Sequence, residues 1–402
     1  MFLDKKKQWI KEFYFLIVFF LFFVSDMLTK YGVYYDKNFF INTSQFVKGI
    51  ISIGFLLIML LSKSKEVYKM LGGVSLLFVI FLIGQYFLED NEVYFFERVK
   101  FNFKTFYWYI SIFIFTGVLY SIDKSLIKKN IYNLLKGIDF FVLVQSMSII
   151  IGLISSIYYF QSYGNTRFGI NGLFINVTQG SYMYSILLLL YYYKYRKLHK
   201  KKDKILIIIL LLSSSLIGTK IMLLFNFLFF NYILFNYMKE KKHIRKSLIL
   251  IFIFSIILLI YGVKIITQSK AFQGLHENSS LFNVLSSNRY NLFLETFIPM
   301  IKNDWSFFNF LFGGGKFYLN RTEFEVIDFI WFFGLLGSIV YFSILNKFLF
   351  DLKKVLFTPP ILFITIAMTF SGSFFSSINT IFLFVIFLLI SNNLLYIKNE
   401  NF

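Results

Sequence analysis

A succession of long apolar runs is the feature that most constrains the fold of this chain. Several of the runs approach the roughly 20 residues that an α-helix needs to cross a bilayer. The composition is 57% hydrophobic and 15% charged, which is too apolar for a soluble domain. We therefore predict an all-α fold, a polytopic transmembrane helix bundle of about 12 spans, two or three of them short. The runs lie near residues 13–28, 45–61, 70–88, 106–122, 138–160, 174–193, 205–218, 221–238, 247–266, 326–346, 360–376 and 378–397.

The distribution of basic residues predicts which ends of these helices face the cytoplasm. Segment 1–12 is basic and leads into the first run without a small-residue cleavage site, so we expect a retained first helix. If this segment is cytoplasmic, the segments on its side hold about two thirds of the 41 Lys and Arg residues. The alternation holds along the whole chain. We therefore predict a multi-pass protein of the cytoplasmic (inner) membrane with both termini in the cytoplasm.

Residues 205–238 are the point on which this topology depends, because two apolar runs meet there with almost no polar gap. Both flanks are strongly basic, which favours two short helices with Gly218, Thr219 and Lys220 at an outer turn. A single span would instead invert everything downstream. No linker or internal repeat divides the chain. We predict one integral membrane domain over 1–402, containing one large extracytoplasmic loop at 267–325.

Several function classes have no support in the sequence. The chain has no Cys and three scattered His residues, so we expect no metal site. The Gly313–Gly315 run is too short for a nucleotide-binding loop, and we expect a flexible turn there and no cofactor. A net charge of +20 would suggest nucleic acid in a soluble protein. Here the charge follows the predicted cytoplasmic segments, which indicates membrane lipid headgroups and no nucleic acid.

Arginine is more informative than the aromatic residues in this composition. The abundance of Phe, Tyr, Ile, Lys and Asn is typical of an AT-rich genome, so aromatic stripes are expected to be core or lipid-facing packing. Only six residues are Arg, and four of these fall on the predicted outer side together with Lys220. Deep cations are costly unless an anion offsets them. Arg guanidinium groups bind phosphate oxygens bidentately and Lys adds a positive charge, so this set suits a diphosphate. The alternatives are that Arg167 only reaches the membrane interface and that Lys220 is an ordinary turn residue.

Carboxylates gather where the predicted outer loop meets the following helix. Glu325 and Asp328 are three residues apart and share a face if the helix has begun, and Glu323 lies just ahead. A carboxylate there could accept the proton of a sugar hydroxyl that attacks an anomeric carbon. The alternative is that acids in the first turn only complement the helix dipole.

Four stretches on the predicted outer face resemble the superfamily of O-antigen and capsular polysaccharide polymerases and O-antigen ligases, membrane glycosyltransferases of the type C architecture. The resemblance covers 167–337, and its parts are weak singly but more specific in their order and spacing. The stretches are RFGINGLF at 167–174 with Asn176 following, IGTK at 217–220, SNR at 287–289 followed by Pro299 and LFGGG at 311–315, and EFEVID at 323–328 followed by GLLG at 334–337.

The resemblance implies transfer of a glycan from undecaprenyl diphosphate to the terminal sugar of another undecaprenyl-diphosphate-linked repeat unit. The resemblance places this reaction at the outer face of the cytoplasmic membrane, without a metal or nucleotide sugar. It also implies a flippase and a chain-length regulator as protein partners. The roles that follow are predictions. Arg167 and Arg289 hold the diphosphate with help from Lys220, while Glu325 or Asp328, beside Glu323, acts as base or orients the acceptor. The remaining predicted substrate contacts are Arg321, Asn171 and Asn176.

Two rival interpretations remain open. In O-antigen ligases a His usually follows the Gly-x-Gly turn, and here carboxylates occupy that stretch, which favours a polymerase. A non-enzymatic polysaccharide flippase or transporter would also have about 12 spans. Its charges are expected near the bilayer midplane with short loops on both sides, unlike the long predicted outer loop.

Overall fold

The chain is helical throughout the part that the structure describes. The computed structural model describes residues 2–89, 93–162, 168–240, 245–268, 289–317, 321–349, 363–364, 372, 374–375 and 377–397. Within these ranges no strand forms, and one isolated bridge joins Gln161 to Ile170. The predicted all-α class is confirmed.

The helices follow the predicted apolar runs, and eleven of the twelve runs fall on helices. The remaining run, 360–376, lies largely outside the described residues. The elements are α1 Phe2–Tyr34, α2 Asn38–Ile41, α3 Thr43–Leu60, α4 Lys65–Phe87, α5 Phe95–Ser121, α6 Lys124–Ser155, the 3₁₀ turn η1 Tyr158–Phe160, α7 Val177–Leu198, α8 Lys201–Ser215, α9 Lys220–Glu240, α10 Arg245–Gln268, α13 Arg289–Leu292, the π-helical η3 Phe293–Phe297, α14 Ile298–Asn303, α15 Phe307–Phe312, α16 Glu325–Phe348 and α18 Ile378–Ile397.

Six helices of the described part are long and apolar enough to cross a membrane. They are Glu12–Tyr34, Asn38–Leu60, Lys65–Phe87, Ser125–Ser155, Lys220–Lys239 and Glu325–Phe348. Protein covers each of these helices only in part, and large apolar side chains such as Leu57, Leu76 and Phe342 are exposed along them. The chain is therefore a multi-pass membrane protein. The count of about twelve spans and the orientation of the termini stay predictions.

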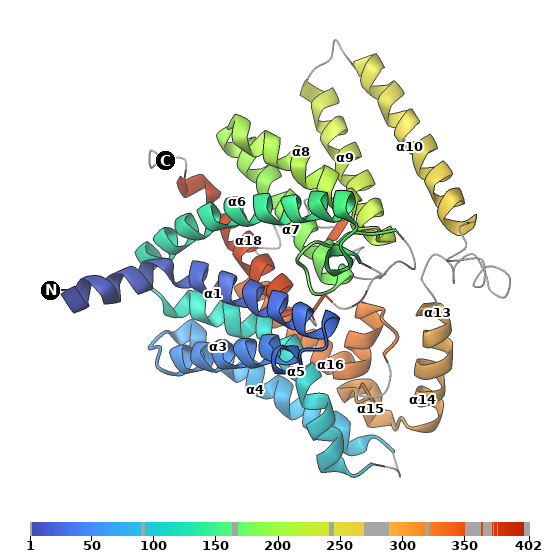
Figure 1. The fold of residues 1–402 in the computed structure, drawn as a ribbon. Helices are drawn as coiled ribbons and strands as arrows, with labels where there is room; N and C mark the ends of the chain where they lie inside the picture. The colour runs from blue at the N-terminus through green and yellow to red at the C-terminus, as the bar shows by residue number, and fades with distance from the viewer. Residues whose placement is uncertain are drawn as a thin grey trace.

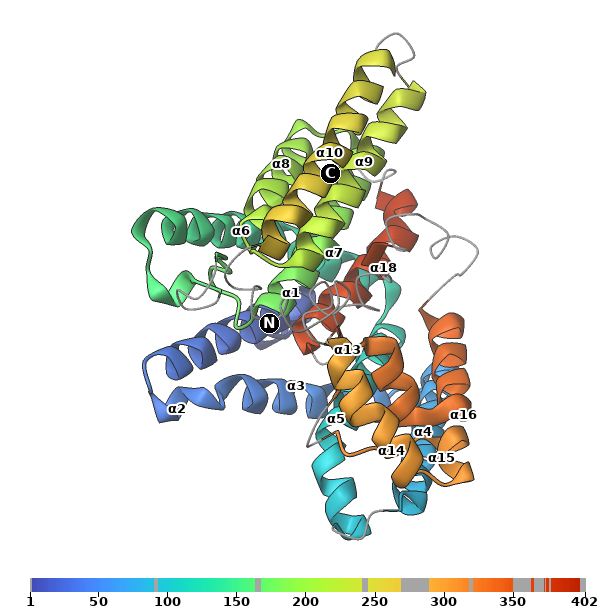
Figure 2. The ribbon, with the colours of Figure 1, turned by 90° about the vertical axis from the view of Figure 1, so that its right-hand side faces the viewer.

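Two groups of helices surround a central helix (Figures 1 and 2). Helices α1, α3, α4, α5 and α13 to α16 form the lower group, and α6 to α10 form the upper group. Helix α18 runs between them and contacts α1, α5 and α7. The described start of α1 and the described end of α18 lie on the same side in Figure 1. The arrangement places the middle of α18 next to residues from both groups.

The predicted hairpin at 205–238 is present. Helix α8 ends at Ser215 and α9 begins at Lys220, and Gly218 between them adopts a positive φ of 79°. A residue with a side chain rarely adopts this backbone conformation, so glycine is suited to the turn. The two helices contact each other and lie side by side in both views.

Aromatic side chains fill the interface between α4, α5 and α16. Phe81 of α4 stacks on Phe332 of α16 with ring centroids 5.3 Å apart, and Tyr109 of α5 meets Phe329 of α16 edge-on at 5.3 Å. These four rings are almost fully buried, so their contacts contribute to the core. This region confirms that the aromatic stripes are packing residues.

The described part of the predicted loop 267–325 contains short helices. Residues 289–317 form α13, η3, α14 and α15, and α15 packs against α4 and α16. The outward position of this segment stays a prediction. Residues 269–288 lie outside the described ranges.

The Gly313–Gly315 run is a packed backbone crossing, which differs from the predicted flexible turn. A Cβ on Gly313 would lie 2.5 Å from the Gly334 nitrogen, and one on Gly314 would lie 2.4 Å from the Gly84 carbonyl oxygen. Asn309 donates to the Gly84 and Gly313 carbonyls at 2.9 and 2.7 Å. The run therefore brings three backbone segments into direct contact, and Gly334 departs from helical geometry where the crossing occurs.

Candidate functional site

A cavity of about 490 Å³ opens between α1, α3, α5, α7 and the start of α18. Its described lining holds four charged side chains, Asp26, Lys48, Lys104 and Arg321. The other lining residues are mostly neutral polar or aromatic: Thr29, Ser44, Gln45, Tyr107, Trp108, Ile175, Asn176, Thr178, Gln179, Ser377 and Ile378. A pocket of this size with a few convergent polar groups is typical of a ligand site.

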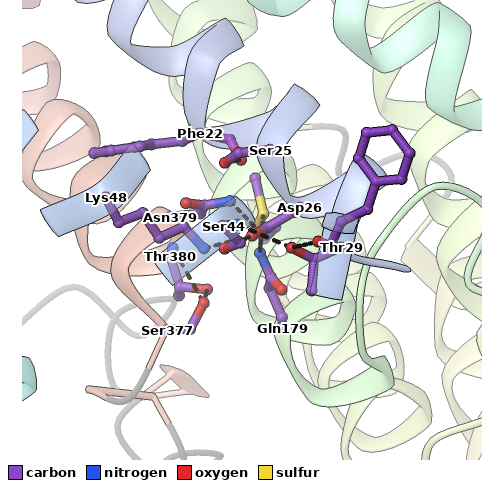
Figure 3. Close-up of polar contacts among 12 residues, drawn as sticks. Phe22, Ser25, Asp26, Thr29, Ser44, Lys48, Gln179, Ser377, Asn379 and Thr380 are labelled. Atoms are coloured by element: carbon purple, nitrogen blue, oxygen red, sulfur yellow. Dashed lines mark hydrogen bonds and ion pairs between the residues drawn. The ribbon is translucent and has the colours of Figure 1, made fainter. Parts of the chain in front are cut away.

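Asp26 joins four helices at the wall of this cavity (Figure 3). Its Oδ1 accepts from the Ser44 hydroxyl and the Lys48 amine of α3, each at 2.5 Å. Its Oδ2 accepts from the Gln179 amide of α7 at 2.7 Å and the Asn379 amide of α18 at 2.5 Å. Only 1% of Asp26 is exposed, so this carboxylate depends on its four donors for the solvation it has lost.

The pairing of Lys48 with Asp26 leaves two cations for a ligand. Lys104 and Arg321 have no hydrogen-bonded or ion-paired acceptor among the described residues. Both lie over the Trp108 ring, the Lys104 amine at 5.1 Å and the Arg321 guanidinium at 5.8 Å from its centroid. The cavity is therefore cationic. The Trp108 ring on its α5 wall attracts Arg321 of the 321–324 loop.

Asp328 holds the loop that carries Arg321. Its Oδ1 accepts from the Thr322 backbone nitrogen at 2.9 Å and the Thr322 hydroxyl at 2.7 Å, and its Oδ2 accepts from the Glu323 nitrogen at 3.1 Å. Asp328 and Thr322 are buried. The Asp328 carboxylate, which was predicted as a base, thus accepts hydrogen bonds from backbone N–H groups just ahead of α16. These bonds fix the path of residues 321–324.

Replacing Asp328 with Asn is expected to loosen this loop. The amide keeps the volume but presents a donor to one of the three donors that the carboxylate now accepts from, at a cost of about 1–3 kcal/mol. Hydrogen exchange measured by mass spectrometry should show faster exchange of the Thr322 and Glu323 amides. Glu295→Gln, on an exposed position of η3, is the matched control. Equal exchange in the two variants would show that Asp328 does not hold the loop.

Arg289 and Glu323 pair with each other. The Arg289 Nε and Nη2 atoms lie 3.2 and 3.1 Å from Glu323 Oε2. The Glu323 side chain is 47% exposed, and its backbone has a positive φ of 58°. Because non-glycine residues rarely adopt this conformation, the surrounding contacts must impose it. Arg289 is not among the described residues that line the cavity.

Glu325 begins α16 but points toward the segment before α18. Its two carboxylate oxygens accept from the Phe374 and Phe375 backbone nitrogens at 3.2 Å each. Glu325 is 5% exposed. Glu325 and Asp328 lie in one helical turn, as the sequence predicts, and both are occupied by backbone amides.

The two predicted asparagines have different surroundings. Asn176 lines the cavity and caps α7, since its Oδ1 accepts from the Gln179 nitrogen at 2.7 Å. Asn171 is buried away from the described cavity wall and accepts from the Lys30 amine at 2.9 Å. Lys30 also donates to the Gly172 carbonyl at 2.6 Å. Asn171 thus ties the loop before α7 to α1.

The Arg167 and Lys220 stretches lie against each other. Arg167 itself is outside the described residues. Its neighbours Phe168 and Gly169 pack on Gly218, where an added Cβ would lie 2.4 Å from the Phe168 carbonyl oxygen. Lys220 begins α9 and is half-buried, but it is not among the described cavity-lining residues. Of the predicted site residues, Arg321 and Asn176 meet in the cavity.

The sequence prediction missed most of the cavity's charged and aromatic lining. Asp26 could have been found, because an acid within a predicted span marks a functional or paired site. Trp108 also carried a signal, since the chain has 58 Phe but only 4 Trp. Lys48 carried the same signal as Asp26, since it lies within the predicted span 45–61. Lys104 carried none, because Lys is the commonest cation of this chain.

No protein family model, no curated protein and no solved structure matches this chain. The described residues contain no group of three or more His, Cys, Asp or Glu side chains that could hold a metal ion. The fold and the cavity define a multi-pass helical membrane protein with a cationic pocket.

Proposed function

We propose that this chain is a membrane glycosyltransferase, a polysaccharide polymerase that acts on undecaprenyl-diphosphate-linked repeat units at the outer face of the cytoplasmic membrane. One observation carries the proposal. A single short loop, held by Asp328, supplies Arg321 to a cationic cavity and Glu323 as a half-exposed carboxylate two residues further on.

The cations bind and stabilise the diphosphate of the donor substrate. The glycan leaves a diphosphate whose charge develops as the glycosidic bond to phosphate breaks. A fixed guanidinium close to that charge stabilises the transition state without reorganising solvent. Arg321 is suited to this task because it faces the cavity and has no acceptor among the described residues.

The carboxylate accepts the proton of the acceptor hydroxyl. As the acceptor hydroxyl oxygen bonds to the anomeric carbon, the bond from that carbon to the phosphate oxygen breaks. The lipid diphosphate departs, and the hydroxyl proton passes to a carboxylate. Among the three predicted acids, Glu323 fits best, because its Oε1 accepts no hydrogen bond from a described residue. Arg289 then orients Glu323, while Glu325 and Asp328 support the loops on either side.

Replacing Glu323 with Gln is expected to lower polymerisation by a factor on the order of 10²–10⁴, the usual contribution of a general base. The test is gel banding of surface polysaccharide from a polymerase-deletion strain complemented with this chain. The wild-type chain should restore a ladder from single repeat units, and Glu323→Gln should leave single units or short chains.

Glu295→Gln is the matched control, because it removes an exposed carboxylate elsewhere in the 289–317 segment. It should restore the full ladder. If the wild-type chain restores export of single units to a flippase-deletion strain but makes no ladder, the protein is a flippase. A ladder made only on lipid A core would instead identify a ligase.

A further inference from the structure

The α5 wall of the cavity carries residues to which the sequence resemblance assigns no role. Lys104 and Trp108 are one helical turn apart on α5, and both line the cavity. Arg321 reaches the same Trp108 ring from a loop more than 200 positions later in the chain. The indole thus brings two cations from different parts of the fold to one place.

Lys104 and Arg321 differ from Lys48, the third cation of the cavity, in their ion pairing. Lys48 is 13% exposed and pairs with the buried Asp26, so its charge is already balanced. Lys104 and Arg321 have no hydrogen-bonded or ion-paired carboxylate among the described residues, although the nearby buried carboxylates of Glu325 and Asp328 attract the Arg321 charge. Both cations lie within 6 Å of the same ring centroid, so one anion that reached both would be attracted by each of them.

Trp108 gives the pair a defined position. Lys and Arg side chains are long, and binding normally costs the freedom of their rotatable bonds. A cation held over an indole face has already lost part of that freedom, because the ring attracts it. The site is therefore partly organised before a ligand enters.

We propose that Lys104, Trp108 and Arg321 form a phosphate-binding subsite for the diphosphate of the ligand. The assignment of a lipid-linked, glycan-bearing diphosphate as that ligand rests on the proposed function. A bidentate guanidinium and an amine together match the oxygens of two linked phosphates.

The remaining lining suits the sugar next to the phosphate. Gln45, Asn176, Thr178 and Ser377 line the cavity, and their side chains carry amides and hydroxyls. These groups donate and accept hydrogen bonds without charge, as sugar hydroxyls require. The volume of about 490 Å³ is within the range of small-molecule sites.

Direct binding tests the subsite. The purified full chain in lipid nanodiscs is titrated with undecaprenyl diphosphate, with undecaprenol as the phosphate-free probe and inorganic diphosphate as the lipid-free one. Lys104→Met and Arg321→Met should each weaken undecaprenyl diphosphate about tenfold or more, the loss of a charge-assisted contact. Neither should change undecaprenol binding.

Lys100→Met is the matched control, because Lys100 is an exposed lysine one turn earlier on α5 and is not among the described lining residues. It should bind like wild type. The unfolding temperature of Lys104→Met should stay within the range of the control, since Lys104 is exposed. Binding by Arg321→Met is measured below its own unfolding transition, because Arg321 is half-buried and the buried Glu325 and Asp328 carboxylates attract its charge. Trp108→Leu should weaken binding less than either cation variant and more than Lys100→Met.

The outcomes separate the subsite from the proposed function. Binding in Lys104→Met and Arg321→Met equal to that in Lys100→Met overturns the subsite, whether or not polymer forms. If the two cation variants bind more weakly than Lys100→Met but the wild-type chain restores no ladder in the complementation assay, the subsite is supported and the polymerase is contradicted. Competition by inorganic diphosphate at the same affinity supports the phosphate contacts and assigns the ligand to a soluble diphosphate.

Discussion

Replacing Asp26 with Asn is expected to destabilise the protein by about 3–5 kcal/mol, the usual cost of breaking a buried ion pair from one side. The Asp26 side chain is 2% exposed, and all four of its contacts are donors. Asparagine keeps the shape but has one acceptor oxygen in place of two. Lys48 then loses its counter-charge. Whichever way the amide turns, its NH2 group faces one pair of donors, either Ser44 with Lys48 or Gln179 with Asn379.

A second substitution distinguishes a charge effect from a packing effect. Lys48→Met removes the cation and keeps an apolar chain of similar length. In the Asp26→Asn and Lys48→Met double variant, the cost should be clearly less than the sum of the single costs, because no unpaired charge remains. The measurement is thermal unfolding of purified protein in one detergent.

Glu66→Gln is the control, since it breaks an exposed ion pair with Lys69 of α4. Solvent and salt screen such a pair, so it contributes little to stability. If Asp26→Asn lowered the unfolding temperature no more than Glu66→Gln, the Asp26 contacts could not be what joins α1, α3, α7 and α18.

The helices were predictable because each depends on a short stretch of sequence. An apolar run about 20 residues long favours a helix wherever it lies in a membrane, because its backbone must be hydrogen-bonded internally. The ends were less predictable. The run at 138–160 covers the second half of α6 and extends past its end at Ser155. The helix begins earlier, at Lys124, because a polar and basic flank can continue a helix outside hydrocarbon.

The cavity was less predictable because its residues are far apart in the chain. Asp26 and Asn379 are 353 positions apart and meet through α18, and no spacing pattern connects them. The position of Arg321 depends on Asp328, and both were predicted as site residues. The sequence indicated the residue types, but whether a carboxylate is exposed or occupied by backbone amides depends on packing.

The rule that made arginine informative also applied to tryptophan. In a chain rich in Lys and Phe, the rare cation and the rare aromatic residue both deserve separate consideration. Arg321 and Trp108 satisfy that condition and contact each other. Treating the aromatic residues as one class hid Trp108, although most Phe rings are indeed core residues.

Replacing Gly334 with Ala is expected to have the second large effect, a loss of folded protein. Gly334 has φ 65° and ψ −173°, a region that residues with a side chain almost never adopt, and a strained residue there costs about 1–3 kcal/mol. A Cβ would also lie 2.3 Å from the Gly313 nitrogen and 2.5 Å from the Leu311 carbonyl oxygen. Both neighbours are backbone atoms, so residues 311–315 must move away from α16 where the two segments cross.

Gly54→Ala on α3 is the control, because a Cβ there meets nothing within 4 Å and alanine favours a helix by about 0.5–1 kcal/mol. Detergent-solubilised yield and unfolding temperature should therefore fall for Gly334→Ala and stay level or rise for Gly54→Ala, whereas equal behaviour would mean that α16 and the glycine run do not cross at this point.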